Sequence, residues 1–157
     1  MPDQSFTITL KNNKLEKDGI EFMKKNHPGY FSVDNRERKH ILDLLDQPHT
    51  FARAFDMIHV PRFAGAVITQ ETIDTHIDEI TLIELKVTSK PLTDNPRGFF
   101  FGATQNEFDL GKRLGNKFKF GFVCLHPDSM TVKTLTVAEL ENMIRTKRVQ
   151  YQINLYR

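Results

Sequence analysis

Apolar and polar positions alternate most clearly between Ile80 and Thr88, in the segment ITLIELKVT. Side chains of a strand alternate between its two faces, so Glu84 and Lys86 project from the same face. The other face is apolar and carries Ile83, Leu85 and Val87. The apolar and β-branched composition predicts a strand buried on both faces. Two charges buried in such a strand cost several kcal/mol each unless they are paired or bound to a metal.

Capping boxes predict where three helices begin. In each, an Asp or Thr is followed three residues later by a Glu, and each side chain bonds to the backbone N–H of the other residue. The pairs are Asp34 with Glu37, Thr104 with Glu107, and Thr136 with Glu139. The helices that they open are expected to run to just before Pro48, over Gln105–Leu114 with Gly115 after its end, and toward Arg145. Apolar spacing predicts an earlier amphipathic helix over Lys14–Lys25.

Short alternating or apolar segments predict the other strands. They are Ser5–Leu10 at an edge, Phe55–Val60, Phe118–Leu125 and Val149–Leu155. The polar segment Thr69–Asp78 is expected to be a loop or hairpin that leads into the strand at Ile80–Thr88. Strands that alternate with helices in this way predict an α/β protein with a central mixed sheet flanked by helices.

The composition fits a single soluble domain. The chain has 157 residues, of which 39% are hydrophobic and 27% are charged, and its formal net charge is +2. No run of about 18 apolar residues is present, which argues against a membrane as partner. The single cysteine, Cys124, cannot form an internal disulfide, which is typical of a cytoplasmic protein. The net charge neither requires nor excludes a nucleic-acid partner, because binding depends on where Lys and Arg cluster.

The acid and the lysine of the central strand predict a magnesium site. Hydrolysis of a phosphodiester needs an activated water and neutralisation of the charge that builds on the phosphate oxygens, and Mg²⁺ held by oxygen ligands supplies both. Asp56 from a neighbouring strand, Glu84 and the backbone carbonyl of Leu85 are the expected ligands. Lys86 is expected to orient the attacking water. Asp74 and Asp78 remain rivals of Asp56 as the second acid.

An acid followed by Glu-Leu-Lys on an apolar strand, then a helix and a strand, resembles the PD-(D/E)xK nuclease superfamily. Four segments look like its restriction-associated branch related to the NO VEIN carboxy-terminal domain: Ile83–Thr88, Phe99–Phe101, Thr104–Glu107 and Phe118–Val123. The resemblance implies a restriction-endonuclease-like three-layer α/β/α core. It also implies a DNA endonuclease of a restriction or defence system that depends on Mg²⁺, with Mn²⁺ as a substitute.

Carried over to this chain, the resemblance places Glu84 and Lys86 at the Glu-x-Lys positions and Asp56 at the first acid. The chain departs from the family pattern in two ways, because no Pro precedes Asp56 and the interval to Glu84 is long. The expected organisation is one domain over residues 1–157. Its parts are a helical region at about 11–50, a catalytic core at about 51–125, and a final helix and strand at about 132–157.

Other residues receive looser roles. Gln105 or Glu107 is a candidate for an accessory contact to metal or water, although Glu107 also serves its capping box. The cations expected to contact DNA phosphates are Lys90, Arg97, Lys112, Arg113 and Lys117, with Arg36, Arg38 and Lys39 on an earlier helix. A homodimer suits cleavage of both strands of a palindrome. The alternative is a catalytically inactive nuclease-like module that binds nucleic acid or a protein, with Glu84 and Lys86 merely paired.

Overall fold

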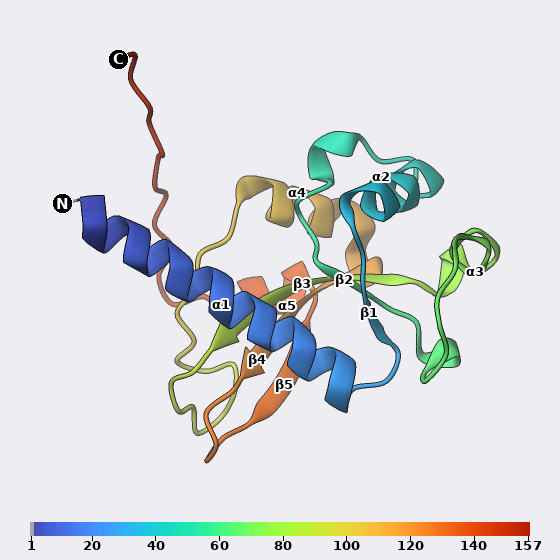
Figure 1. Ribbon diagram of the computed structural model, residues 1–157, viewed down its shortest axis with the longest axis horizontal. Coiled ribbons are helices and arrows are strands. Elements are labelled where there is room, and N and C mark those ends of the chain that lie inside the picture. Colours follow the sequence, from blue (N-terminus) through green and yellow to red (C-terminus); the bar gives the residue numbers. More distant parts are fainter. Residues whose placement is uncertain (1) are drawn as a thin grey trace.

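A sheet of five strands in the order β1-β2-β3-β4-β5 runs through the middle of the molecule (Figure 1). The computed structural model describes the backbone of residues 2–157 and the side chains of residues 13–157. The strands are β1 at Tyr30–Ser32, β2 at Met57–His59, β3 at Thr81–Thr88, β4 at Phe118–Cys124 and β5 at Thr131–Leu135. Only the pair β3–β4 is parallel, so the described sheet is mixed as the sequence predicted.

Helices cover both faces of this sheet. They are α1 at Pro2–Asn26, α2 at Asn35–Leu44, α3 at Gln70–Thr75, α4 at Gln105–Leu114 and α5 at Val137–Glu141. Helix α1 packs on one face, where its Met23 joins Ile83 and Leu85 of β3. Helices α4 and α5 pack on the other face, where Phe108 and Leu140 belong to the same apolar cluster as Phe120 and Leu82. The prediction of an α/β protein with a mixed sheet between helices is confirmed.

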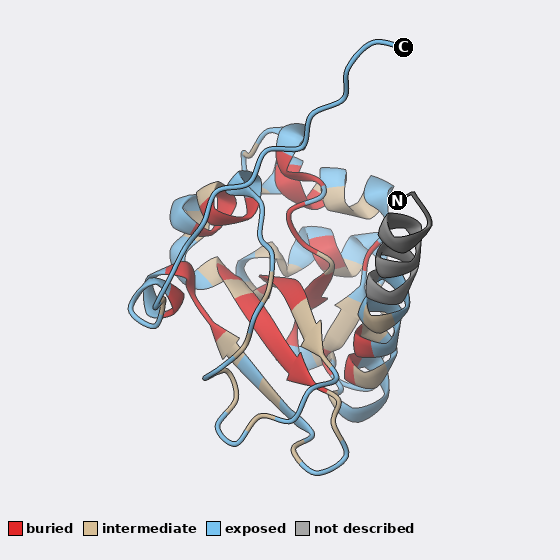
Figure 2. Ribbon diagram, turned by 90° about the vertical axis from the view of Figure 1, so that its left-hand side faces the viewer, coloured by how far each residue is buried: buried red, intermediate tan, exposed pale blue. Residues whose placement is uncertain are grey.

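Strand β3 is buried from both sides, as its composition predicted. Figure 2 shows the inner strands as the most buried part of the sheet. Leu82 and Ile83 point to opposite faces and are both fully buried. The close fit to α1 depends on Gly19, because a Cβ at that position lies 2.4 Å from Cγ2 of Val87. The helix therefore lies directly on the second half of β3.

All three predicted capping boxes form. Asp34, Thr104 and Thr136 each accept a hydrogen bond from the backbone N–H of the Glu three residues later, and each Glu side chain bonds back to the N-cap N–H. Gly115 ends α4 with a φ of 57°, a left-handed value that glycine adopts without the steric cost of a Cβ. These local signals placed the helix starts correctly, although α5 ends at Glu141 rather than near Arg145.

Three predicted segments are different in the structure. The expected edge strand Ser5–Leu10 belongs to helix α1, where the backbone hydrogen bonds are satisfied without a partner strand. The expected loop Thr69–Asp78 contains helix α3, whose first turn is capped by the Thr69 hydroxyl. The expected closing strand Val149–Leu155 is exposed and pairs with no described strand. Alternation alone therefore did not decide these structures.

Strands β1 and β5 were not predicted. β1 has only three residues, and β5 alternates exposed and half-buried positions along its length. Both lie at the edges of the sheet, where one side of the strand lacks a partner and the apolar signal is weak. No helix in the described part of the chain is long and apolar enough to cross a membrane.

Candidate metal site at the open edge of β3

Asp56 lies beside Glu84. β2 is antiparallel to β3, and Met57, the first residue of β2, is the register partner of Ile83. The backbone N–H of Asp56 donates a 2.8 Å hydrogen bond to the carbonyl of the same Ile83, so Asp56 lies just outside the paired register. After burial, the charge of Asp56 has the largest effect on the pKa of Glu84, which places the two carboxyl groups close together. The structure thus brings the acid chosen from the sequence to Glu84.

Beyond this point, β3 has an open edge toward β2. β2 begins at Met57, so the side chain of Asp56 replaces a strand partner: its Oδ2 accepts a 3.0 Å hydrogen bond from the backbone N–H of Leu85. In an extended strand, the N–H and C=O of one residue point to the same side. The carbonyl of Leu85, which was predicted to be the third ligand, therefore also faces the side on which Asp56 lies.

Lys86 lies between two carboxylates. Its Nζ is 3.2 Å from Oε2 of Glu84 and 2.6 Å from Oε1 of Glu107. All three side chains are largely buried, with exposed fractions of 11% for Lys86, 10% for Glu84 and 5% for Glu107. Asp56, Glu84, Lys86 and Glu107 are called the β3 cluster below. It joins residues that are up to 51 positions apart in the sequence, from β3, α4 and the segment that precedes β2.

Glu107 is held in place by the capping box that starts α4. Its Oε2 accepts hydrogen bonds from the backbone N–H and the hydroxyl of Thr104, at 3.2 and 2.7 Å. Its Oε1 is then left for the ammonium of Lys86. The same glutamate therefore fixes the start of a helix and the position of the lysine. The sequence suggested an accessory contact of Glu107 to metal or water, and the contact that it forms in the structure is with Lys86.

The β3 cluster has more acid than base, and this changes the protonation of Glu84. Burial raises the pKa of Glu84 to about 10, and the charges of Asp56 and Glu107 act in the same direction against the opposite effect of Lys86. Burial lowers the pKa of Lys86, but the charges of Glu84 and Glu107 outweigh this and raise it above the ordinary value. With a pKa of about 10, Glu84 holds a proton at neutral pH, and Glu107 is the closer partner of the Lys86 ammonium.

One atom of the cluster has no partner. Oε1 of Glu84 is buried and forms no hydrogen bond with any described group. Leaving a buried polar atom unsatisfied costs about 1–3 kcal/mol. A carboxylate oxygen in this state, beside a second acid and a backbone carbonyl, matches the oxygen ligands that Mg²⁺ prefers. These residues therefore fit a divalent cation.

The protein would supply two carboxylate ligands to this cation, from Asp56 and Glu84, and not a complete set of side-chain ligands. Among the described residues, no group of three or more His, Cys, Asp and Glu side chains is arranged to hold a metal ion. Mg²⁺ commonly takes one or two carboxylates from the protein and fills its other positions with water and substrate phosphate oxygens. Asp56 is only half-buried, which leaves this side of the cluster open to such groups.

Sequence reasoning missed Glu16, which lies close to the cluster. It is one helical turn before Gly19, the residue of α1 that packs on Val87. Burial raises the pKa of the Glu16 carboxyl, the charges of Asp56 and Glu107 raise it further, and Lys86 lowers it. The same groups thus act on Glu16 and on Glu84. No sequence spacing linked α1 to β3, because the approach depends on the packing of the helix across the sheet.

The rival residues lie elsewhere or have other partners. Asp74 pairs with His40 on α2, and Asp78 is exposed after α3. The side-chain amide of Gln105 donates to Asp109 on the outer surface of α4. Neither rival acid has a contact with Glu84 or Lys86 in the described part of the chain. Asp56 is therefore the only one of the three candidate acids that joins the cluster.

Four of the five cations first expected to contact DNA bind other protein groups. Lys112 pairs with Glu141 at 3.3 Å, and Arg97 pairs with Asp94 at 3.5 Å. The guanidinium of Arg113 lies 4.9 Å from the centre of the Phe51 ring, and Nζ of Lys117 donates to the carbonyls of Ile77 and Asp78. Lys90 is exposed, as are Arg36 and Lys39 on α2, whereas Arg38 donates to the carbonyl of Val33.

Comparison of the chain with protein-family models, with curated proteins and with solved structures gives no match. The β3 cluster itself is therefore the basis for a proposed function.

Proposed function

We propose that this protein is a Mg²⁺-dependent nuclease that hydrolyses phosphodiester bonds of DNA at the β3 cluster. A restriction-endonuclease-like core and a role in restriction or defence are parts of the same proposal, and they come from the resemblance of the Glu84–Lys86 strand and the segments that follow it. The contacts of the β3 cluster support the chemistry independently of that resemblance.

The observation that carries the proposal is the buried, unpartnered Oε1 of Glu84 beside Asp56. The cluster contains three acids, Asp56, Glu84 and Glu107, and Lys86 is its one base, so it has more acid than base. In addition, Oε1 of Glu84 has no hydrogen-bond partner. A structural ion pair needs no second acid and leaves no oxygen unsatisfied, since that only adds cost. A cation bound to both carboxylates removes both problems.

Each residue has a distinct part in the proposed reaction. Asp56, Glu84 and the Leu85 carbonyl hold the metal, which, when bound, supplies positive charge to the phosphate and lowers the pKa of a water molecule. Lys86, fixed by Glu107, presents a protonated ammonium that orients the attacking water and stabilises negative charge as it develops. Glu107 acts through Lys86 and is a positioning residue.

Cleavage by a lysine variant tests the proposed chemistry. Lys86→Met keeps most of the buried aliphatic stem and removes the ammonium. We expect it to cut supercoiled plasmid DNA in Mg²⁺ at least about a hundredfold more slowly than the wild type, the loss typical of removing one group that stabilises charge in the transition state. DNA binding should stay within threefold. Lys133→Ala, an exposed lysine on β5, is the matched control and should cut normally.

Metal binding provides the second half of the same test. Mn²⁺ titration by calorimetry should show binding that Glu84→Gln abolishes and that Glu79→Gln, a change at a half-buried acid outside the β3 cluster, leaves intact. Wild-type cleavage by Lys86→Met, or Mn²⁺ binding that does not depend on Glu84, contradicts the proposed site. The alternative of an inactive module that binds nucleic acid or a protein predicts no metal-dependent cutting by the wild type and no binding of Mn²⁺ at Glu84.

A further inference from the structure

The last sixteen residues differ in charge from the rest of the chain. Residues 142–157 contain Arg145, Lys147, Arg148 and Arg157 and no Asp or Glu. All 20 acidic residues therefore lie in residues 1–141, together with the other 18 of the 22 Lys and Arg, so that part has a formal net charge of −2. The overall value of +2 hides this division. A slightly acidic body ends in a purely basic tail.

The tail, residues 142–157, begins beside α4, the helix whose Glu107 binds Lys86. Ile144 packs against the main apolar cluster, and Nζ of Lys147 lies 4.8 Å from the centre of the Phe108 ring on α4. Phe108 follows Glu107, and its ring contacts Phe120, whose ring centre is 5.9 Å from Nζ of Lys86. Three successive side-chain contacts thus connect the start of the tail to the β3 cluster.

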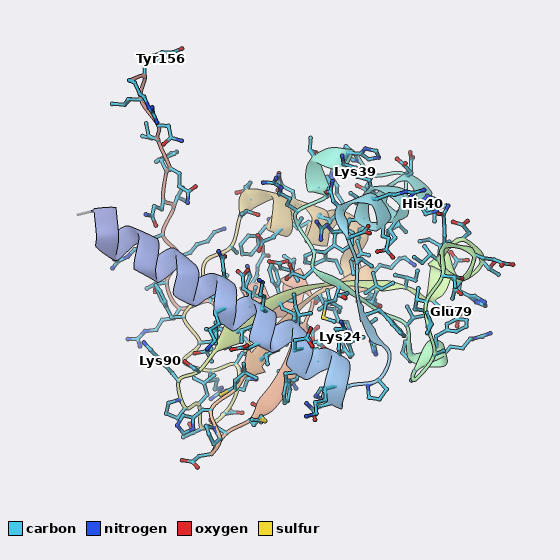
Figure 3. All side chains as sticks on the ribbon, in the orientation of Figure 1. Lys24, Lys39, His40, Glu79, Lys90 and Tyr156 are labelled. Atoms are coloured by element: carbon cyan, nitrogen blue, oxygen red, sulfur yellow. The ribbon has the colours of Figure 1, made fainter. Side chains whose placement is uncertain are left out.

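Beyond Arg148, the tail is extended and exposed. The exposed fraction is 80% for Tyr151 and complete for Tyr156. Figures 1 and 3 show the tail running away from the body, with Tyr156 standing clear of the other elements. Nine extended residues reach about 30 Å, which is enough to follow several nucleotides.

The tail cations are free where most of the other candidate cations are engaged. Within the described residues, Arg145, Arg148 and Arg157 form no ion pair and no side-chain hydrogen bond, whereas Lys112 and Arg97 pair with acids. A guanidinium with no protein partner keeps its fork of donors available for a phosphate. The positive charge that the acidic body lacks is therefore available in the tail.

We propose that residues 145–157 form an arm that binds the nucleic-acid strand next to the β3 cluster. Arg145, Arg148 and Arg157 bind phosphates, and Tyr151 and Tyr156 stack on bases. The choice of nucleic acid as ligand depends on the proposed function. A disordered or extended basic arm of this kind adds affinity without contributing to the chemistry of the site.

Binding measured without divalent metal tests the arm separately from cleavage. A full-length variant with Arg145, Lys147, Arg148 and Arg157 all changed to Gln is compared with one in which Lys14, Lys24, Lys25 and Lys133 are changed to Gln. The second set removes the same charge from exposed positions on α1 and β5, of which Lys24 is labelled in Figure 3. The probe is a fluorescein-labelled DNA of about 20 nucleotides, single-stranded or duplex, in EDTA, read by anisotropy at several salt concentrations.

We expect the tail variant to lose at least tenfold in affinity at about 50 mM salt, and the control variant less than threefold. The slope of log K against log salt for duplex DNA should become shallower by about 2 to 4 units, since each phosphate contact contributes about 0.9. A second variant, Tyr151→Ser with Tyr156→Ser, keeps the charge and should weaken binding to the single strand more than to the duplex. Unchanged melting temperatures show that the variants fold.

Other results would contradict the proposal that residues 145–157 bind nucleic acid. Equal losses in the tail and control variants mean that only net charge matters. Unchanged DNA affinity together with conversion of a dimer to a monomer means that the tail pairs with a second copy of the chain. If the tail variant loses DNA binding while Lys86→Met still cuts, the arm stands and the proposed nuclease site is wrong. If the tail variant binds DNA normally while Lys86→Met fails to cut, the site stands and the arm is wrong.

Discussion

Two groups of charged side chains in this protein are built from similar parts and behave in opposite ways. The β3 cluster has one lysine among several acids and is largely buried. The second group, called the α3 cluster, consists of Arg62, His76 and Glu79 and lies near the surface. There, one acid has two basic partners: Glu79 accepts from Nε of Arg62 at 2.9 Å and bonds Nδ1 of His76 at 2.7 Å.

The protonation of the acids follows this difference. The hydrogen bond from His76 lowers the pKa of Glu79, and the charge of Arg62 adds to this effect against the contrary effect of burial. Burial and neighbouring acids raise the pKa of Glu84. The acid of the α3 cluster is therefore balanced by its own bases, whereas the β3 cluster has more acids than bases and holds a proton on Glu84. Excess buried acid, rather than the mere presence of an ion pair, distinguishes a site that receives a ligand from one that only stabilises the surface.

Glu84→Gln should have the largest effect on the stability of the metal-free protein. In the wild type, folded Glu84 keeps its proton up to a pKa of about 10, whereas in the unfolded chain it ionises near its ordinary pKa of 4.5. The folded state then binds more protons between these values, so the free energy of unfolding falls as the pH rises through this range. Glutamine does not titrate, so the variant should lose this dependence and exceed the wild type by about 2 kcal/mol or more at pH 8.5.

Urea unfolding in EDTA at pH 6 and pH 8.5 measures this difference. Saturating Mn²⁺ should reverse the order at pH 8.5, because the ion stabilises only a chain that can bind it. A wild type whose stability does not fall between the two pH values, or a variant that follows it in parallel, shows that Glu84 is not held in its protonated form. In that case the contrast between the two clusters is lost.

Glu107→Gln and Thr104→Ala separate the two roles of the α4 capping box. Gln at the third helical position still supports a capping box, but it removes the charge that faces Lys86. We expect cleavage by Glu107→Gln to fall at least tenfold and the alkaline limb of its pH–rate profile to move to lower pH, because the pKa of Lys86 loses one of the charges that raise it. Thr104→Ala removes the cap, should cost about 1 kcal/mol of stability, and should change the rate less than threefold.

The measurements are plasmid-cutting rates between pH 6 and 10 and urea midpoints for both variants. Equal loss of activity in the two variants means that Glu107 matters only as a helix cap. An unshifted pH profile for Glu107→Gln means that its charge does not tune Lys86. Either outcome reduces the β3 cluster to the two adjacent acids and the lysine.

How much of this could be predicted from the sequence depends on how local each signal is. The helix starts at Asp34, Thr104 and Thr136 were correct because a capping box is complete within four residues. The burial of β3 was correct because its own composition fixes it. Asp56 was chosen from an apolar segment with an acid at its start, and its hydrogen bonds to the backbone of Ile83 and Leu85 then bring it beside Glu84.

What the sequence left open depends on distant partners. A β-strand forms only when a second strand lies beside it and completes its hydrogen bonds. The alternation at Val149–Leu155 could not reveal that no described strand lies beside that segment. Glu16 belongs to the site only through the contact of Gly19 with Val87, which couples residues 68 positions apart. The freedom of Arg148 and the engagement of Lys112 are likewise consequences of packing, since both residues occur in equally basic segments.

Glu79→Gln should have the smallest effect and forms the other side of the comparison. The lowered pKa of Glu79 means that its contribution is present above the ordinary value of 4.5 and is lost as the pH falls below it. Between pH 6 and pH 8.5, the contribution of an exposed pair to stability is small and does not change with pH. Urea midpoints for Glu79→Gln should therefore lie slightly below the wild type by the same small amount at both pH values and converge with the wild type in acid. Stabilisation of Glu79→Gln at pH 8.5 comparable to that of Glu84→Gln would mean that surface acids contribute the same effect, and the β3 cluster would no longer be distinct.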